Sequence, residues 1–255
     1  MIDIHSHILP GIDDGAKTMT DSLAMAQAAV KDGIHTIIAT PHHQNGKYMN
    51  PKTNIEMYVK ELNDQLQEEN IPLTVLAGQE TRLNGDMITE LQTDVIATLN
   101  NTKYVFVEFP SGEVPRYAEQ MLFDIQVAGY TPIIVHPERN RQIAEHPSIL
   151  FNLVQKGSLT QVTAASVAGK FGKTIQKLSH QLIDANLTHF IASDAHNTTT
   201  RGFAMHEAYK IIRNEHGNEV FYMFMENAQL LIDGQAVYRN EPQPVKKKKK
   251  ILGLF

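Results

Sequence analysis

Histidine and carboxylate side chains recur along this chain in a spacing typical of metal binding. The N-terminal stretch "IDIHSHILPGIDDGA" places His5 and His7 two residues apart, and a pair of aspartates follows them. Because successive side chains of an extended strand point to opposite sides, both imidazoles project from the same side of the chain. Asp194 and His196 repeat this spacing in "IASDAHN". Histidine nitrogen and carboxylate oxygen are ligands suited to Zn, Mn or Fe(II), so the pattern predicts a metal site.

Further candidate ligands occur singly, at or just after the ends of short apolar runs; they are His42, Glu80, Glu108 and His136. Glu108 follows "YVFV", and an unpaired carboxylate beside such a strand is costly to bury, so a bound cation is the simplest reason for its presence. The other seven histidines are interpreted as turn residues or partners of a helix dipole: His35, His43, His146, His180, His189, His206 and His216.

The hydrophobic pattern predicts the elements that bring these residues together. Short β-branched runs, predicted to be strands, cover residues 2–4, 35–40, 73–78, 104–109, 131–136, 159–164 and 189–194. Amphipathic stretches, predicted to be helices, cover residues 21–31, 52–69, 85–98, 117–128, 148–156, 173–185, 202–215 and 226–232. Alternation of this kind predicts an α/β fold with a parallel sheet, and seven repeats favour closure into a (β/α)7 barrel.

In such a barrel the C-terminal ends of all strands share one face, which carries the active site. Every predicted strand except the sixth ends at a candidate ligand, and the sixth offers only Thr163 and Ser166. Residues from both ends of the chain are therefore expected to converge on one cavity.

Composition excludes several classes of protein. The 255 residues include no cysteine, so a disulfide scaffold, a thiolate metal site and a cysteine nucleophile are all excluded. The net charge is −5, and five lysines at 246–250 supply five positive charges, so the rest of the chain carries −10. A body this acidic argues against nucleic acid as a partner. An 18-residue apolar run and a secretory leader pattern are both missing, so we expect a cytoplasmic protein.

Six motifs together resemble the polymerase and histidinol phosphatase (PHP) superfamily: "IDIHSHILPGIDDGA", "IIATPHH", "GQE", "VFVEF", "VHPERNR" and "IASDAHN". More closely, the chain resembles the metal-dependent tyrosine-protein phosphatases of Gram-positive capsule and exopolysaccharide operons. The resemblance implies a distorted seven-stranded PHP barrel over residues 1–240 and a cofactor of three metal ions, usually manganese.

The resemblance also implies roles for individual residues. The first metal would be held by His5, His7, Glu80 and Asp194. Glu80 would bridge to a second metal, completed by Glu108 and His136, and the third would be held by Asp14, His42 and His196. Many relatives have a histidine in place of Asp14, and the neighbouring Asp13 is its rival. Arg139 and Arg201 resemble the arginines that bind phosphate.

Charge supports a phosphate substrate independently. Four carboxylates and three divalent cations give a net charge of +2, which attracts a phosphomonoester dianion, and arginine adds a fork that matches phosphate oxygens. Bound divalent cations lower the pKa of water from 15.7 toward ~7, so activated water can replace the missing thiolate nucleophile. A tyrosine leaving group has a pKa of about 10 and departs without a strong general acid, which stays unassigned.

The family's substrate is a membrane-associated bacterial tyrosine kinase that controls capsule synthesis, so the expected partner is a tyrosine-phosphorylated protein of this kind. The tail at 241–255, "EPQPVKKKKKILGLF", is basic and ends in apolar residues. It is expected either to contact an anionic membrane surface peripherally or to be a solubilising extension.

Other functions stay open. They are a small-molecule phosphatase of the histidinol-phosphate type, a nuclease-like phosphodiesterase, which the acidic body disfavours, and a non-catalytic module that docks on the kinase. "VAGKFGKT" at 167–174 resembles a P-loop, but Val167 stands where the first glycine is required. It is interpreted as a flexible basic loop near the mouth of the site.

Overall fold

The computed structural model describes residues 1–245, and its strands are all parallel to their neighbours. The strands are β1 (Ile2–Ser6), β2 (Thr36–Ala39), β3 (His42–His43), β4 (Thr74–Ala77), β5 (Glu80–Arg82), β6 (Tyr104–Glu108), β7 (Thr131–Val135), β8 (Leu159–Thr163) and β9 (Phe190–Ala192). They form two sheets, in the orders β1-β2-β4 and β3-β5-β6-β7-β8-β9. The predicted α/β fold with parallel strands is confirmed.

All seven predicted strands are present, and two of them are followed, after a break, by a short strand that was not predicted, β3 and β5, which gives nine segments and distorts the barrel. Pro41, which has no backbone N–H, separates β2 from β3, and Gly78 with Gln79 separates β4 from β5. The ring closes where the end of β1 meets the segment after β9, through a parallel bridge between Ser6 and Ala195. The ends of the first and last strands therefore lie side by side.

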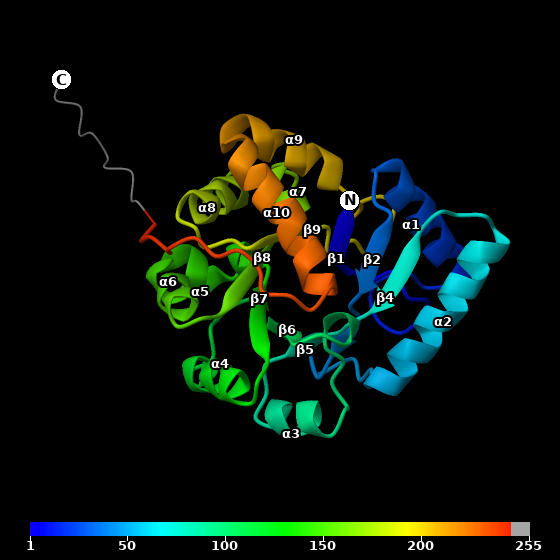
Figure 1. The fold of residues 1–255 in the computed structure, drawn as a ribbon, viewed down its shortest axis with the longest axis horizontal. Coiled ribbons are helices and arrows are strands. Elements are labelled where there is room, and N and C mark those ends of the chain that lie inside the picture. Colours follow the sequence, from blue (N-terminus) through cyan, green and yellow to red (C-terminus); the bar gives the residue numbers. More distant parts are fainter. Residues whose placement is uncertain (246–255) are drawn as a thin grey trace.

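Helices surround these strands, and one of them, α10, crosses in front of the barrel in Figure 1. The helices are α1 (Met19–Lys31), α2 (Lys52–Glu68), α3 (Met87–Gln92), α4 (Ala118–Val127), α5 (Arg141–Glu145), α6 (Ser148–Gln155), α7 (Ala164–Val167), α8 (Lys173–Asp184), α9 (Met205–Glu215) and α10 (Gly217–Ile232), with 3-10 turns at Leu99–Asn101 and Pro137–Arg139.

Two apolar cores hold the layers together. The larger lies between the strands and the helices, and the smaller fills the barrel interior with residues such as Ile4, Phe106 and Phe190. Leu231 of α10 and Val237 belong to this interior core. Because α10 covers the N-terminal end of the barrel, the opposite end, where the strands finish, is the one left for a site.

The predicted helices differ from the observed ones in three places. The helix expected over 85–98 ends at Gln92, because the chain turns at Asp94, whose φ is +61°. The helix expected to begin at residue 226 begins at Gly217, because "VFYMF" continues its apolar face toward the N-terminus. The short helices α5 and α7 were not predicted, since four or five residues are too few to show a helical period.

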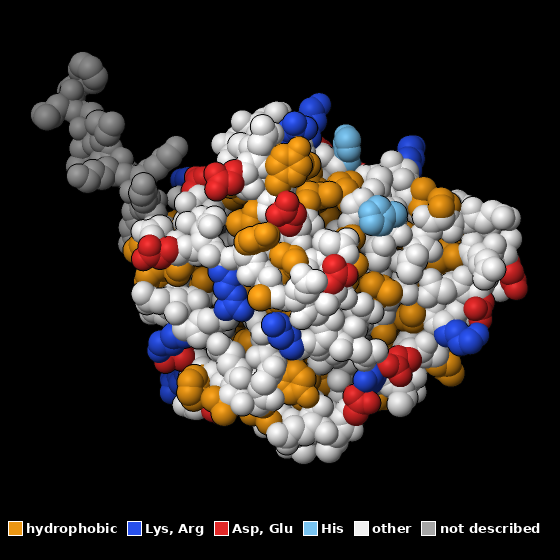
Figure 2. Space-filling view, in the orientation of Figure 1, with side chains coloured by type: hydrophobic (Ala, Val, Ile, Leu, Met, Phe, Trp, Pro, Cys, Tyr) orange, Lys and Arg blue, Asp and Glu red, His pale blue; other side chains and the backbone are white. Residues whose placement is uncertain are grey.

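Figure 2 shows the face that carries α10, with Lys, Arg, Asp and Glu side chains scattered over it and apolar side chains among them. Among residues 1–245, none of the helices is both long and apolar enough to cross a bilayer.

The beginning of the predicted tail still contacts the body, since Gln243 donates a backbone hydrogen bond to Ala185 at 2.8 Å. The lysines and the apolar end at 246–255 lie outside the described residues.

Candidate metal centre

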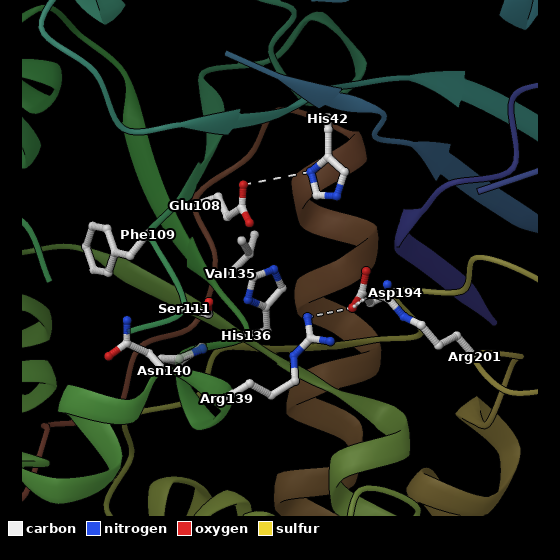
Figure 3. A pocket seen from close by; sticks show the side chains of 11 residues that line it. His42, Glu108, Phe109, Ser111, Val135, His136, Arg139, Asn140, Asp194 and Arg201 are labelled. Atoms are coloured by element: carbon white, nitrogen blue, oxygen red, sulfur yellow. Dashed lines mark hydrogen bonds and ion pairs between the residues drawn. The ribbon is translucent and has the colours of Figure 1, made fainter. Parts of the chain in front are cut away.

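The strand ends meet around a cavity of about 310 Å³, and the residues that line it come from all parts of the chain (Figure 3). In Figure 3, Glu108 and His42 approach each other on one side, and Arg139 and Arg201 both approach Asp194 on the other. All nine candidate ligands and both arginines lie in or beside this cavity: His5, His7, Asp14, His42, Glu80, Glu108, His136, Asp194 and His196, with Arg139 and Arg201.

A first group of donor atoms comes from His5, His7, Glu80 and Asp194, all of them buried. Glu80 Oε2 lies 3.2 Å from Nε2 of both histidines, and these two nitrogens are 3.3 Å apart. Asp194 Oδ1 lies 3.4 and 3.3 Å from the same nitrogens. Donor atoms around one tetrahedral cation with bonds of about 2.0–2.1 Å are separated by about 3.3 Å, so this spacing fits a single ion.

Two further groups share residues with the first. His7, Asp14, His42 and His196 form the second group, in which Asp14 Oδ1 lies 3.4 Å from Nε2 of both His42 and His196. His42, Glu80 and Glu108 form the third, with His42 Nδ1 at 3.1 Å from Glu80 Oε2 and 3.8 Å from Glu108 Oε2. The three groups of potential ligand atoms therefore overlap and form one continuous set of side chains.

His136 lies on the far side of Glu80 from these groups. Its Nε2 is 2.6 Å from Glu80 Oε1, the oxygen that does not face His5 and His7. Burial, followed by the charge of Arg139, lowers the pKa of His136 to about 4. Its imidazole is therefore neutral near pH 7, as a metal ligand must be.

Several buried donor atoms lack a hydrogen-bond partner in the described part of the chain. Asp194 Oδ1, His42 Nδ1 and His196 Nε2 face charged neighbours but make no hydrogen bond, and all three atoms belong to residues of the groups above. Leaving a buried polar atom without a hydrogen bond costs about 1–3 kcal/mol, so unpartnered atoms that converge on shared points need an explanation. Bound cations supply one, and the residues present fit them.

The ring nitrogens that face away from the groups are held by other residues. His7 Nδ1 lies 2.6 Å from Asp13 Oδ2, and His5 Nδ1 lies 2.9 Å from Gln161 Oε1. His196 Nδ1 lies 2.9 Å from the backbone oxygen of Asp194. Since each of these oxygens can only accept, each histidine directs its Nε2 lone pair into the centre, which is the usual support for metal-binding histidines.

The backbone around the site contains close and strained conformations. A Cβ atom on Gly15 would collide with the carbonyl oxygen and Cβ of His7, so the turn that carries Asp13 and Asp14 can approach only because residue 15 is glycine. His136 and Asp194 follow their strands with φ values of +36° and +51°, a left-handed conformation that is uncommon outside glycine. Such conformations cluster at functional sites, where they redirect side chains.

Arginines balance part of the negative charge. Arg139 Nη2 and Arg201 Nη2 lie 2.6 and 3.0 Å from Asp194 Oδ2, so one oxygen of Asp194 faces the histidines and the other faces the arginines. Arg82 donates two hydrogen bonds of 3.0 Å to the carboxylate of Glu108.

The carboxylates differ in how readily they ionise. Burial raises the pKa of Glu108 to about 7, and the charge of Glu80 adds to this rise, while Arg82 opposes it. Burial would also raise the pKa of Asp194, but Arg139 and His5 hold it well below its usual range. Nearby positive charge therefore keeps Asp194 ionised, whereas Glu108 is poised to gain or lose its proton near neutral pH.

Sequence reasoning missed the supporting residues. Arg82 lies two positions after Glu80 in the same short strand, and Gln161 lies within the sixth strand, which was expected to contribute only Thr163 and Ser166. These last two instead bind the buried Glu138, through the backbone N–H of Thr163 at 3.0 Å and the hydroxyl of Ser166 at 2.7 Å. Polar and apolar residues do not alternate in "LTQVT", so nothing in the sequence singled out Gln161.

The two adjacent aspartates differ in their contacts. Asp14 belongs to a donor group, whereas Asp13 is buried and accepts from His7, from the Gly15 N–H at 2.8 Å and from the His42 N–H at 3.2 Å.

The loop at 167–174 does reach the site, since the Arg139 guanidinium lies over the Phe171 ring, with Cζ 5.8 Å from the ring centroid.

Comparisons with known proteins identify the family of this chain. The family model described as "Capsular polysaccharide synthesis, CpsB/CapC" matches residues 1–233. Tyrosine-protein phosphatase YwqE of Bacillus subtilis is 51% identical over the full length of both chains, and tyrosine-protein phosphatase CpsB of Streptococcus agalactiae is 31% identical over 91% of this chain and 98% of its own.

Solved structures give the same result. A crystal structure from a pair comprising YwqE of Bacillus subtilis and CpsB of Streptococcus pneumoniae, described as metal-dependent tyrosine phosphatases, superposes with a TM-score of 0.95 at 52% identity, covering 97% of this chain and all of that one. Histidinol phosphate phosphatase of Lactococcus lactis shares the fold, with a TM-score of 0.55 at 14% identity over 86% of this chain and 95% of its own. The resemblance noted in the sequence is thus confirmed, and this chain belongs to the CpsB/CapC capsular polysaccharide synthesis family, as a tyrosine-protein phosphatase with a PHP-type barrel.

Proposed function

We propose that this enzyme hydrolyses phosphotyrosine on a protein substrate by means of three divalent cations, with manganese as the natural metal. The observation that carries the proposal is the set of three overlapping donor groups beside a cavity that two arginines line. The donor set contains only nitrogen and oxygen, which suits Mn and also Zn or Fe(II).

The nine ligands divide among the three ions as the family pattern indicates. His5, His7, Glu80 and Asp194 would hold the first ion, Glu80, Glu108 and His136 the second, and Asp14, His42 and His196 the third. The first assignment is supported by the mutual spacing of about 3.3 Å, and the third by Asp14 Oδ1, which lies 3.4 Å from both histidines. The bridging role proposed for Glu80 is supported by its two oxygens, one of which faces His136 and the other His42.

The protein's own residues bind and orient the substrate. Divalent cations supply Lewis acidity and an activated water when they are bound. Arg139 and Arg201 line the cavity, and their guanidinium forks match the oxygens of a phosphate group. Five carboxylates face three arginines at the site, so the side chains carry a net negative charge before metal binding, and loading with dications reverses the sign and favours a phosphate dianion.

The leaving group limits what else is required. A phenolate with a pKa of about 10 departs more readily than an alkoxide, so no residue is proposed as a general acid. The chain has no cysteine, so hydrolysis by a thiolate is excluded.

We propose a membrane-associated bacterial tyrosine kinase as the substrate and the cytoplasm, at the inner face of the membrane, as the location. Support comes from the description of the family as capsular polysaccharide synthesis proteins and from the basic, apolar-ended sequence at 241–255. In this proposal, residues 1–240 form one catalytic domain and the tail increases encounters at an anionic surface, at about 1 kcal/mol per lysine.

Turnover of three substrates, with and without Mn²⁺, tests the proposal: a phosphotyrosine peptide, histidinol phosphate and single-stranded DNA. We expect Mn²⁺-dependent release of phosphate from the peptide, loss of activity with a chelator and indifference to iodoacetamide. Preferential turnover of histidinol phosphate would favour the small-molecule phosphatase, and cleavage of DNA would favour the phosphodiesterase. Binding of a phosphorylated kinase without turnover of any substrate would favour the docking module.

A further inference from the structure

A second group of histidines lies on the helical layer, outside the strand-end cavity. His180 and Asp184 lie one turn apart on α8, Glu215 is the last residue of α9, and His216 joins α9 to α10. His180 Nδ1 lies 2.7 Å from His216 Nε2 and 3.5 Å from Glu215 Oε2. The two imidazole rings are nearly parallel, 13° apart, and meet edge to edge through these nitrogens, with ring centroids 5.0 Å apart. We refer to these four residues as the α8–α9 cluster.

The outer ring nitrogens of both histidines already have partners. His216 Nδ1 lies 2.9 Å from Asp184 Oδ1, and His180 hydrogen-bonds the backbone of Val167 at the end of α7. A carboxylate and a backbone carbonyl can only accept, so both outer nitrogens carry their protons. In the neutral rings the inner nitrogens, 2.7 Å apart, are then both lone pairs, and two lone pairs at this distance repel unless a proton or a cation lies between them.

The arrangement matches the support that metal-binding histidines usually have, in which the second ring nitrogen donates to a carboxylate or a backbone oxygen. We propose that the α8–α9 cluster binds one divalent transition-metal ion of the zinc type, through His180 Nδ1, His216 Nε2 and the Glu215 carboxylate, with water in the fourth position. Two nitrogens and one carboxylate are a common donor set for zinc in an open site.

The distances are close to those required. Donor atoms on one tetrahedral zinc ion are about 3.3 Å apart. The distance of 3.5 Å between His180 Nδ1 and Glu215 Oε2 is already close to this value, whereas the distance of 2.7 Å between His180 Nδ1 and His216 Nε2 must increase by about 0.6 Å when the ion binds. The side chain of Glu215 is 60% exposed and free to adjust, and that of His180 is 16% exposed, so an ion can enter from solvent. The bound ion would connect α8 to the junction of α9 and α10.

The test measures zinc per chain in the full-length protein. Wild type, His180→Gln and His216→Gln are saturated with Zn²⁺, passed through a desalting column and analysed by mass spectrometry. The strand-end centre takes up the same amount of metal in all three, so we expect wild type to retain one equivalent more than either variant. His146→Gln, which changes an exposed histidine elsewhere, is the matched control and retains the wild-type amount.

Folding is checked separately, because His216 lies in a tight junction. Glu215→Gln removes only a largely exposed carboxylate, so it folds, and we expect it to weaken retention of the extra equivalent at least tenfold. Added Zn²⁺ is also expected to raise the Tm of the Mn²⁺-loaded wild type but not that of His180→Gln, while both hydrolyse an aryl phosphate equally. Equal zinc content in wild type and all variants would overturn the proposal and identify the histidines as a pair that shares a proton.

Discussion

Replacing Asp13 by asparagine tests whether this buried carboxylate holds the first ligand in place. Asp13 Oδ2 accepts from His7 Nδ1 at 2.6 Å and from the His42 N–H at 3.2 Å, while Oδ1 accepts from the Gly15 N–H at 2.8 Å. Burial would raise the pKa of Asp13, but His7 and the N–H of Gly15 hold it below its usual value, so the group is ionised. Asparagine keeps the shape and loses both the charge and one acceptor.

The magnitude follows from these contacts. An asparagine side chain has a single oxygen, so its NH₂ group must face either Gly15 N–H or the two donors on the other side. Losing a charge-assisted hydrogen bond costs about 1.5–3 kcal/mol, and supporting residues of this type typically change metal affinity by about 10–100-fold. We therefore expect Asp13→Asn to raise the apparent Kd for Mn²⁺ by about 10–100-fold, equivalent to about 1.4–2.7 kcal/mol.

Calorimetric titration of Mn²⁺ measures the Kd, and hydrolysis of an aryl phosphate at saturating Mn²⁺ measures what remains of kcat. Because Asp13 acts through His7, we expect kcat to recover largely once the metal is saturating. Asp14→Asn alters a donor group directly, so its loss of activity is not expected to recover. Asp86→Asn, at an exposed position before α3, is the neutral control.

An Mn²⁺ affinity within twofold of wild type for Asp13→Asn would refute the reasoning, because it would mean that His7 is oriented without its partner. Recovery of Asp14→Asn together with irreversible loss in Asp13→Asn would reverse the roles of the two aspartates.

Three further predictions concern the turn, the core and the tail. Gly15→Ala forces the turn away from the His7 carbonyl, so we expect lower Mn²⁺ content and a Tm several degrees lower, as measured by metal analysis and thermal melting; normal values would contradict the close approach. Burial lowers the pKa of His189 from an ordinary 6.5 to about 3. Between these two pH values only the unfolded chain binds a proton at this histidine, so the free energy of unfolding falls as the pH is lowered through this range and stops falling below about pH 3. At pH 5 the free energy of unfolding is lower by about 2 kcal/mol from this cause. His189→Asn removes the titrating group but can still accept from the Thr160 N–H, so urea melts of the variant should show a decrease between neutral pH and pH 5 that is smaller by that amount. An equal decrease in wild type and variant would contradict this prediction. Deleting residues 245–255 should leave hydrolysis of a soluble aryl phosphate unchanged and weaken binding to anionic vesicles, and a drop in kcat would show that the tail serves the active site.

The seven predicted strands and most helices follow from local patterns. Strands such as "YVFVE" and "TPIIV" are continuous apolar runs, as expected where a parallel sheet is covered on both sides, and the helices between them show one apolar face. The prediction over 85–98 was wrong in length because a helical period in "MITELQTDVIATL" does not reveal that the chain turns at Asp94. The breaks that separate β3 from β2 and β5 from β4 likewise depend on how neighbouring strands fit around the ring.

The sequence by itself determined which side chains stand at strand ends, because the alternation of apolar runs and turns places His5, Glu80, Glu108 and Asp194 there whatever the packing. Only the tertiary structure decided which atoms meet: Arg82 with Glu108, Gln161 with His5, and Asp13 behind His7 while Asp14 faces the centre. These pairs join residues whose separation along the chain carries no signal, since their contact depends on strand register, on the close approach at Gly15 and on left-handed backbone at two strand ends. Local propensities select the elements, whereas the distances of a few ångströms on which cation binding depends are set by how the whole barrel closes.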